Sequence, residues 1–264
     1  MTNDMINNMK EKESTAFELN DKLCTSYNLS ILEKGCSELN ITLTERQKNQ
    51  FIRYYEYLIE KNKVMNLTGI TEFQEVLVKH FVDSLACVQA VDMKQVKTVM
   101  DVGTGAGFPG IPLKIAFPHL KVCLLDSLRK RVNFLEETFT LLGLDNITAI
   151  HGRAEEYARD KAYRQKYDMC VSRAVSNLAT LSEYCLPYVK TGGTFISYKS
   201  GKVQEETDQA AKAVKILGGH VKDIQYFTLP GTEIERSLVI IDKVKETPGK
   251  FPRKAGTPLK EPIC

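Results

Sequence analysis

A glycine-rich turn that directly follows a short apolar run constrains the fold of this chain most. Residues 99–113 read VMDVGTGAGFPGIPL, so an apolar segment gives way to four glycines and then to prolines where a helix would begin. A strand, a glycine turn and a helix N-terminus together are typical of a nucleotide-binding turn, because glycine permits positive φ and free N–H groups face the ligand. We therefore expect a nucleotide-like ligand. The spacing Gly105-x-Gly107-x-x-Gly110 also fits the dinucleotide pattern, which leaves the ligand open at this point.

Length and composition favour a folded α/β protein without a membrane span or a metal site. With 264 residues, 43% of them hydrophobic and 26% charged, the chain can form one large α/β domain and a smaller attachment. No apolar run approaches the roughly 20 residues of a membrane span, and the first residues lack the apolar region of a signal peptide. The seven cysteines form no CxxC or Cys/His cluster, so neither zinc nor a disulfide framework is predicted. We expect a monomer in a reducing cytoplasm.

From about residue 96 the sequence alternates between apolar runs of strand length and longer helical stretches. The predicted strands are 98–102, 121–125, 147–150, 167–171, 194–198, 220–229 and 237–241, and the predicted helices are 110–117, 128–142, 177–189 and 203–217. This alternation predicts a parallel sheet with helices on both faces. The last two strands are joined by LPGTEIER, which is too short for a crossover helix and predicts an antiparallel hairpin. The expected fold is a seven-stranded, mostly parallel α/β sheet whose last strand is antiparallel.

Helices are predicted before the sheet. Residues 1–28 are polar, with little periodicity, and are expected to be a mobile extension. The pattern T-x-x-Q at 44–47 and again at 71–74 resembles a capping box at two helix starts. Asp83 is expected to cap a further short helix. The first third of the chain is therefore predicted to be helical.

The last residues are rich in proline, glycine and lysine. From Lys243 to the C-terminus there are six lysines and arginines against two glutamates, which predicts a basic, extended tail. We hypothesise that this tail contributes affinity for RNA, although a solvated tail without a partner is the alternative. The predicted organisation is an N-terminal extension and helical domain at 1–92, the sheet domain at 93–243 and the tail at 244–264.

The residues that follow each predicted strand are candidates for a site, because ligands of open α/β sheets bind beyond the carboxyl ends of the strands. Asp126 lies 23 residues beyond Gly103, where a carboxylate can accept hydrogen bonds from two ribose hydroxyls. Capping the helix that begins at Leu128 is the simpler role, and both can hold at once. Ala154 and Glu155 follow the third strand, where a polar group can meet the edge of a base.

Cations lie at the ends of three other predicted strands. Arg173, Lys199 and Arg236 are predicted to form an anion-binding rim around the same cleft, with isolated surface cations as the alternative. The stretch SRAV after the fourth strand lacks the Asn/Asp-Pro-Pro-aromatic signature of enzymes that methylate exocyclic amines of bases. It also lacks the Pro-Cys nucleophile of enzymes that attack pyrimidine C5.

Taken together, these motifs resemble one known family. VMDVGTGAGFPGIPLKIAFP, LLDSLRKRVNFL, MNLTGI, KHFVDSL, VSRAV, ERSLVII and FPRKAGTPLKEPI resemble the RsmG (GidB) family of small-subunit (16S) ribosomal RNA guanine-N7 methyltransferases. The resemblance covers about residues 40–264. It implies a Rossmann-like class I methyltransferase domain with a small helical N-terminal domain. It also implies S-adenosyl-L-methionine as cofactor, and 16S rRNA or the assembling small ribosomal subunit as partner.

The resemblance also implies roles for individual residues. Its cofactor-binding positions are Gly103, Gly105 and Phe108 in the glycine turn, Asp126, Ser127 and Leu128 at the ribose, Ala154 and Glu155 near the adenine, and Arg173 at the edge between cofactor and target. Arg173 and Lys199 are the candidate catalytic residues, acting by positioning and charge. Phe108 replaces a leucine that is frequent in the family, which is a conservative apolar change. His80, Asp83 and Asn66 belong to shared motifs, but the resemblance gives them no role.

The chemistry of guanine N7 agrees with this resemblance. N7 presents an in-plane lone pair at the major-groove edge and needs no deprotonation before in-line attack on a sulfonium methyl. Neither a general base, a metal nor a covalent nucleophile is required, and catalysis should come from positioning and electrostatics. Two alternatives remain. One is a non-catalytic RNA-binding or ribosome assembly factor on the same fold. The other is an NAD-dependent oxidoreductase, against which the terminal hairpin and the absence of a second large domain argue.

Overall fold

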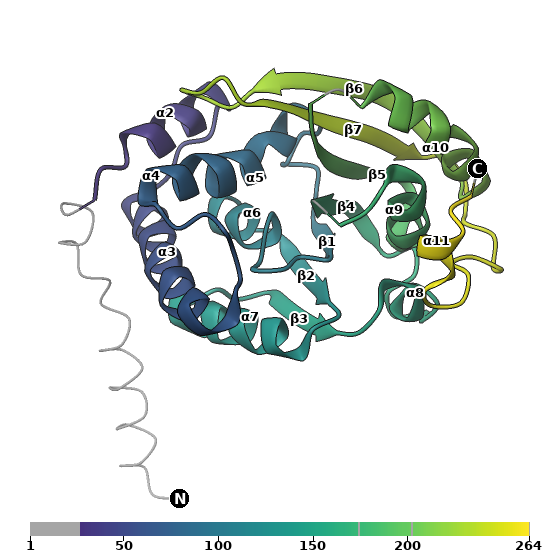
Figure 1. Ribbon diagram of the computed structural model, residues 1–264, viewed down its shortest axis with the longest axis horizontal. Coiled ribbons are helices and arrows are strands. Elements are labelled where there is room, and N and C mark those ends of the chain that lie inside the picture. The colour runs from purple at the N-terminus through teal and green to yellow at the C-terminus, as the bar shows by residue number, and fades with distance from the viewer. Residues whose placement is uncertain (1–26, 174, 202, 264) are drawn as a thin grey trace, which may run out of the picture.

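One seven-stranded sheet forms the centre of the molecule. The computed structural model describes residues 27–173, 175–201 and 203–263, so the expected extension at 1–28 lies almost wholly outside the described residues. The strands follow the order β3-β2-β1-β4-β5-β7-β6 (Figure 1). Their bounds are β1 Thr98–Val102, β2 Lys121–Asp126, β3 Ile147–His151, β4 Tyr167–Arg173, β5 Val189–Ser200, β6 Gly219–Thr228 and β7 Glu235–Lys243.

Six strands are parallel and one is antiparallel, as predicted. β1 to β5 pair in parallel, whereas β7 pairs antiparallel with both β5 and β6. Helices connect the parallel strands: α6 Gly110–Ala116, α7 Arg129–Leu142, α8 Ala154–Tyr157, α9 Leu178–Cys185 and α10 Gln204–Ile216. The strand order reverses between β1 and β4, so the ligand site is expected at the carboxyl ends of these two strands.

The two faces of the sheet carry two separate hydrophobic clusters. Successive residues of a strand point to opposite faces, so Val99 packs with α6 and α7 while Met100 packs with α9 and α10. The helices at the start of the chain cover the same face as α6 and α7, and their side chains join that cluster (Figure 1). No helix in the described ranges is long and apolar enough to cross a membrane.

The helices that precede the sheet are α2 Ser30–Glu38, α3 Glu45–Met65, α4 Phe73–Val76, the π-helical segment η2 Leu77–Val82, α5 Asp83–Leu85 and the 3₁₀ segment η3 Ala86–Gln89. The capping box of α3 is confirmed, because Thr44 and Gln47 exchange both expected hydrogen bonds. The second predicted box is wrong: α4 begins at Phe73, and the Glu72 carboxylate caps it by accepting from the Glu75 amide.

Asp83 does not cap a helix either. It lies inside the helical run formed by α4, η2, α5 and η3, where the residues on both sides have right-handed helical backbone angles. Its side chain is buried and points to the sheet. A short polar residue after an apolar run is a good N-cap signal, but in this protein tertiary ion pairs rather than a helix terminus satisfy the carboxylate.

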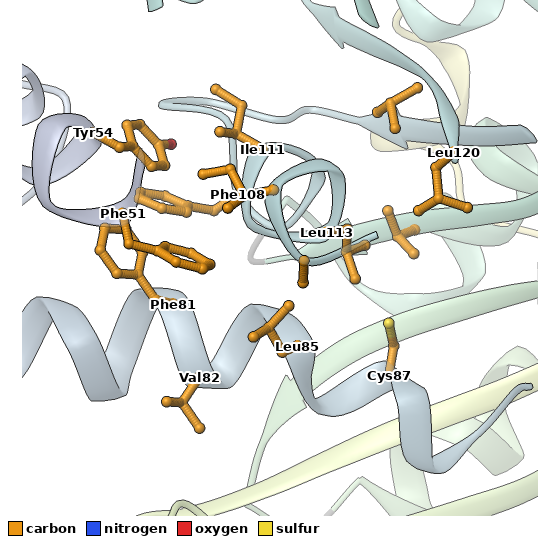
Figure 2. Close-up of a cluster of buried hydrophobic side chains, with 14 of the residues drawn as sticks. Phe51, Tyr54, Phe81, Val82, Leu85, Cys87, Phe108, Ile111, Leu113 and Leu120 are labelled. Carbon is orange, nitrogen blue, oxygen red and sulfur yellow. The ribbon is translucent and has the colours of Figure 1, made fainter. Parts of the chain in front are cut away.

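Helix α3 attaches the N-terminal helices to the glycine turn. The hydroxyl of Tyr54, which is fully buried, donates to the Ala106 carbonyl at 2.5 Å. Gln47 Nε2 donates to the Ile115 and Ala116 carbonyls at the end of α6. Tyr54 also packs beside Phe81 and Phe108, so aromatic rings from three segments meet behind the turn (Figure 2). The N-terminal helices therefore support the turn from one side.

The C-terminal residues are not an extended tail. The side chain of Arg164 donates to the carbonyls of Thr247 and Phe251, and Phe251 is buried. The chain then forms the short helix α11, Thr257–Lys260, beside α8 and α9 (Figure 1). The prediction failed because composition alone gave no sign of buried partners from other parts of the chain. Lys243 is also buried, so it is not one of the cations available on the surface.

Candidate functional site

Asp101 in β1 holds the glycine turn together. Its Oδ2 accepts hydrogen bonds from the Thr104 hydroxyl at 2.7 Å and from the Gly110 amide at 2.9 Å. A Cβ at Gly110 would lie 2.2 Å from Leu124 Cδ2, so glycine is needed there for α6 to approach β2. This is the role of the last glycine in nucleotide-binding turns.

The same carboxyl group is electrostatically unusual. Asp101 is fully buried, and its Oδ1 has no hydrogen-bond partner among the described residues. Burial raises the pKa of Asp101 to about 7, although the bonds from Thr104 and Gly110 favour the carboxylate. Sequence reasoning missed this residue, and the available signal was one carboxyl group within an otherwise apolar strand.

The front of the turn lies against the end of β2 and is open. Gly103 and Gly105 have φ of +72° and +62°, a backbone conformation that favours glycine. A Cβ at Gly105 would meet nothing within 4 Å, so the turn leaves room for a ligand there. The Gly103 amide donates to the Leu125 carbonyl at 2.8 Å and the Gly105 amide donates to Asp126 Oδ2 at 2.9 Å.

Asp126 is therefore a buried carboxylate held in place by its neighbours. Besides the Gly105 bond, its Oδ1 accepts from the Leu128 amide at 2.9 Å, and Arg131 lies 3.4 Å from Oδ2. The bond to Leu128 is at the start of α7, so the helix-start role and the ligand role are compatible. A carboxylate offers about four acceptor sites, which leaves capacity for the hydroxyls of a ligand.

A cavity of about 390 Å³ opens in front of this carboxylate. We call it the Asp126 cavity. Five of the predicted cofactor positions line it: Gly103, Asp126, Ser127, Ala154 and Glu155. Its volume lies within the range of small-molecule sites. Leu128 lines neither this cavity nor the next one, and its side chain is 42% exposed, so only its amide contributes, through Asp126.

A second cavity of about 500 Å³, which we call the Arg173 cavity, lies on the other side of the turn. Gly103 and Arg131 line both cavities, so the two meet at the glycine turn. The remaining predicted positions line the second one: Gly105, Phe108, Arg173, Lys199 and Arg236. The three cations predicted to meet thus line one cavity, which adjoins the Asp126 cavity, and their roles stay predictions.

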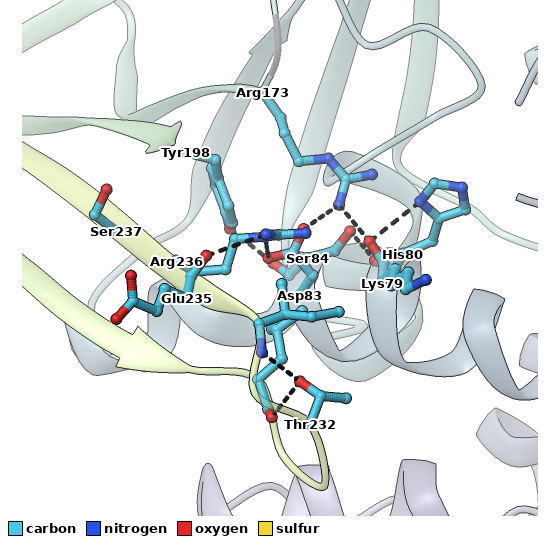
Figure 3. A network of polar contacts seen from close by, with 12 residues as sticks. Lys79, His80, Asp83, Ser84, Arg173, Tyr198, Thr232, Glu235, Arg236 and Ser237 are labelled. Atoms are coloured by element: carbon cyan, nitrogen blue, oxygen red, sulfur yellow. Dashed lines mark hydrogen bonds and ion pairs between the residues drawn. The ribbon is translucent and has the colours of Figure 1, made fainter. Parts of the chain in front are cut away.

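Two of these cations share one buried carboxylate. Arg173 Nη1 lies 2.9 Å from Asp83 Oδ2, and Arg236 Nε lies 3.3 Å from Asp83 Oδ1 (Figure 3). The Asp83 side chain is 5% exposed, whereas the two arginine side chains are 15% and 22% exposed. Because a carboxylate on the N-terminal helices holds cations from β4 and β7, three distant segments form this edge of the cavity.

Lys199 is bound differently from the other two cations. Its ammonium donates to the Ser176 carbonyl at 2.9 Å and to Glu206 Oε1 at 2.7 Å. A carboxylate of α10 thus neutralises its charge, and the bond to the Ser176 carbonyl holds the segment after β4 in place. Lys199 lines the cavity, but it is committed to these two partners.

An aromatic stack forms the floor of the Arg173 cavity. The ring centroids of Phe108 and His80 lie 4.5 Å apart. The Cζ atom of Arg173 lies over the face of the Phe108 ring, 5.1 Å from its centroid. Burial and the nearby Arg173 charge lower the pKa of His80 to about 3, so its imidazole is neutral at pH 7. His80 Nε2 lies 2.7 Å from the Thr68 hydroxyl. Asn66, the third residue without an implied role, ends α3 with left-handed backbone angles.

The described residues contain no group of three or more His, Cys, Asp or Glu that could hold a metal ion. Five cysteines among them, Cys36, Cys87, Cys123, Cys170 and Cys185, are buried and free. The polar side chains that line the two cavities carry carboxylates, guanidinium groups, ammonium groups, hydroxyls and the His80 imidazole.

Known proteins with similar sequences are named for one activity. Residues 47–239 match the model of a family, GidB, that is described as rRNA small subunit methyltransferase G. A ribosomal RNA small subunit methyltransferase G from Lachnoclostridium phytofermentans is 54% identical over 230 residues, which cover 87% of this chain and 95% of that protein. The protein of the same name from Alkaliphilus metalliredigens is 51% identical over 233 residues, covering 88% of this chain and 98% of that protein.

Proposed function

The chain belongs to the GidB family of rRNA small subunit methyltransferase G proteins, and from this premise we propose that it methylates N7 of a guanine in small-subunit (16S) ribosomal RNA, with S-adenosylmethionine as the methyl donor. The observation that carries the proposal is the pair of cavities that meet at the glycine turn. One is suited to a nucleoside and the other presents arginines toward a target.

The residues of the Asp126 cavity fit the nucleoside part of this cofactor. A buried carboxylate at the end of β2 suits a ribose, and Gly103 of the turn lines the same cavity, with the open backbone at Gly105 at the adjoining Arg173 cavity. Ala154 and Glu155 would lie at the adenine end, because they line the same cavity beyond Asp126. When bound, S-adenosylmethionine supplies a methyl group on a positively charged sulfur.

The Arg173 cavity supports a nucleophile that needs no deprotonation. His80 is a very weak base, with its pKa lowered to about 3, and Asp83 is committed to two arginines. Burial raises the pKa of Tyr198 well above its usual value, and its hydroxyl donates to the Ser84 carbonyl. Among the described residues that line this cavity, no group is placed as a general base, which agrees with attack by guanine N7.

The cations would then position the RNA. Arg173 and Arg236 each use part of the guanidinium group on Asp83, and the remaining N–H donors can bind a phosphate or the guanine O6. Lys199 would act indirectly, because its bond to the Ser176 carbonyl fixes the segment between the two cavities. Catalysis would thus consist of holding N7 in line with the methyl group.

The test is methyl transfer from labelled S-adenosylmethionine to 16S rRNA and to small ribosomal subunits lacking the modification. We expect one labelled guanine, at which borohydride and aniline cleave the RNA because N7 is methylated. Label at an exocyclic amine or at a ribose would overturn the N7 assignment. Binding of cofactor and RNA without transfer would favour an assembly factor, and tight binding of NADH alone would favour an oxidoreductase.

We also propose that the protein acts as a cytoplasmic monomer, since the substrate is ribosomal RNA and one chain contributes both cavities. Sedimentation at working concentration and cell fractionation test these two points. A dimer in sedimentation, or recovery outside the cytoplasmic fraction, would contradict them.

A further inference from the structure

The segment 253–260, which we call the C-terminal wall, borders the site from an unexpected direction. Leu259 in α11 is one of the residues that line the Asp126 cavity. Its helix α11 lies next to α8 and α9, on the side of the molecule away from the N-terminal helices (Figure 1). Nothing in the proposed function uses these residues.

Charged and polar contacts hold the wall in place. Arg253 binds the Glu183 carboxylate through Nε at 3.0 Å and Nη2 at 2.7 Å, and its backbone amide also donates to Glu183 at 2.6 Å. The Glu183 side chain is 1% exposed, so its carboxylate is buried and the ion pair is more than a surface contact. The Thr180 hydroxyl donates to the carbonyl of Pro258, the buried residue next to Leu259.

The wall is also bonded directly to a residue of the cavity. Glu155 Oε1 accepts a hydrogen bond from the Gly256 amide at 2.7 Å, and the Glu155 side chain is buried. Gly256 has a φ of +83°, which favours glycine at this bend. The position of Glu155, which faces the proposed adenine site, and the position of the wall therefore depend on one another.

Leu259 is exposed even though the wall is firmly held. It is 59% exposed and lines the cavity together with the side chains of Val175 and Tyr184, so it adds to an existing apolar part of the lining. An apolar side chain in this place gains by contact with a flat apolar surface, and the faces of an adenine ring provide one. Leu259 itself is unsuited to an RNA phosphate because it is apolar, and the Arg253 charge is paired with Glu183, whereas Lys254 and Lys260 of the same segment are exposed.

We propose that the C-terminal wall is part of the cofactor site and that Leu259 covers the adenine ring of S-adenosylmethionine. The proposal rests on the proposed function and adds a binding residue to it.

The test uses full-length protein and S-adenosylhomocysteine, the stable product of the methyl donor. In calorimetry, Leu259→Ser should raise the Kd about tenfold, whereas Val244→Ser should leave it unchanged. Val244 is a matched control because it is 50% exposed, apolar, near the end of the chain and absent from both cavities. Neither variant removes a core side chain, and circular dichroism checks the fold.

Two further measurements separate the outcomes. Hydrogen exchange at 253–260 should slow when the product is added to the wild type, and filter binding should give equal RNA affinity for Leu259→Ser and the wild type without cofactor. Unchanged product affinity together with unchanged exchange would overturn the inference and leave the proposed function standing, as would a loss confined to RNA affinity. If the wild type bound neither S-adenosylmethionine nor its product, the proposed function itself would fail.

Discussion

Replacing Asp83 by asparagine should disable the target side of the site while leaving the protein folded. Asparagine keeps the shape of the side chain, but its amide group turns a donor toward one of the two arginines that the carboxylate now holds. A hydrogen bond between charged groups contributes about 1.5–3 kcal/mol. Since the arginine side chains are 15% and 22% exposed, solvent screens part of this, and we expect a loss of about 2 kcal/mol.

The same energy sets the expected effect on the reaction. If the arginines must regain their arrangement when RNA binds, a cost of about 2 kcal/mol lowers kcat/KM for RNA about 30-fold. The assays are urea unfolding followed by circular dichroism, and methyl transfer from labelled cofactor at increasing RNA concentration. Calorimetry with S-adenosylmethionine measures the other substrate, whose Kd should change less than threefold because Asp83 does not line the Asp126 cavity.

The control is Asp208→Asn, which removes an exposed carboxylate on α10 that accepts a hydrogen bond from Gln204 and lines neither cavity. It should match the wild type in every assay. A second variant, Arg236→Gln, breaks one contact and keeps the bond between Arg173 and Asp83, so it should show a smaller loss of stability with a similar loss of RNA turnover. If Asp83→Asn is less stable than the wild type but methylates RNA equally fast, the reasoning is refuted and Asp83 is a purely structural residue.

Three more predictions concern the turn. Asp126→Ala should raise the Kd for S-adenosylmethionine at least about 100-fold in calorimetry, because two charged hydrogen bonds to ribose hydroxyls would be lost. Asp101 holds its proton in the native state at pH values where the unfolded chain has released it, so its contribution to stability is present at low pH and declines as pH rises from about 4 to about 7. From pH 5 to pH 8, the free energy of unfolding of the wild type should fall by on the order of 2–3 kcal/mol more than that of Asp101→Asn, as measured by urea unfolding. Tyr54→Phe should cost about 1–2 kcal/mol, measured in the same way, because the buried Ala106 carbonyl loses its donor.

Each of these three has an outcome that contradicts it. Unchanged cofactor affinity in Asp126→Ala would remove the ribose role and leave only its bonds within the turn. Parallel pH profiles for the wild type and Asp101→Asn would mean that the carboxyl group titrates near its ordinary value. A fully stable Tyr54→Phe would mean that the Ala106 carbonyl finds another donor.

The parts of the site that could be predicted are those governed by the sheet. Asp126 ends β2 and Glu155 comes shortly after β3, and because parallel strands bring their carboxyl ends to one edge, the sequence places both residues at the cavity that they line. The residues that depend on long-range partners could not be found this way. The partners of Asp83 lie 90 and 153 residues away in sequence, so a local pattern made it resemble a helix cap.

The C-terminal wall illustrates the same limit. A segment rich in proline, glycine and lysine is usually solvated, and its composition predicts a tail. What orders it here is Glu183, a buried carboxylate 70 residues away that needs a cation, and Arg253 meets that need. The composition of a segment does not show which groups from other parts of the chain will bind it in the folded protein.

The position of β7 between β5 and β6 has a consequence for synthesis of the protein. When the ribosome has made β1 to β6, the edge of β5 still lacks its neighbour, and β6 has nothing to pair with. An unpaired edge of this kind invites association with other chains until the last strand is released. Arg236, which joins Asp83, arrives on that same strand. A nascent chain thus completes its sheet and the arginine-lined edge of the Arg173 cavity in one late step. A chain cut short before β7 would therefore be exposed to aggregation and proteolysis.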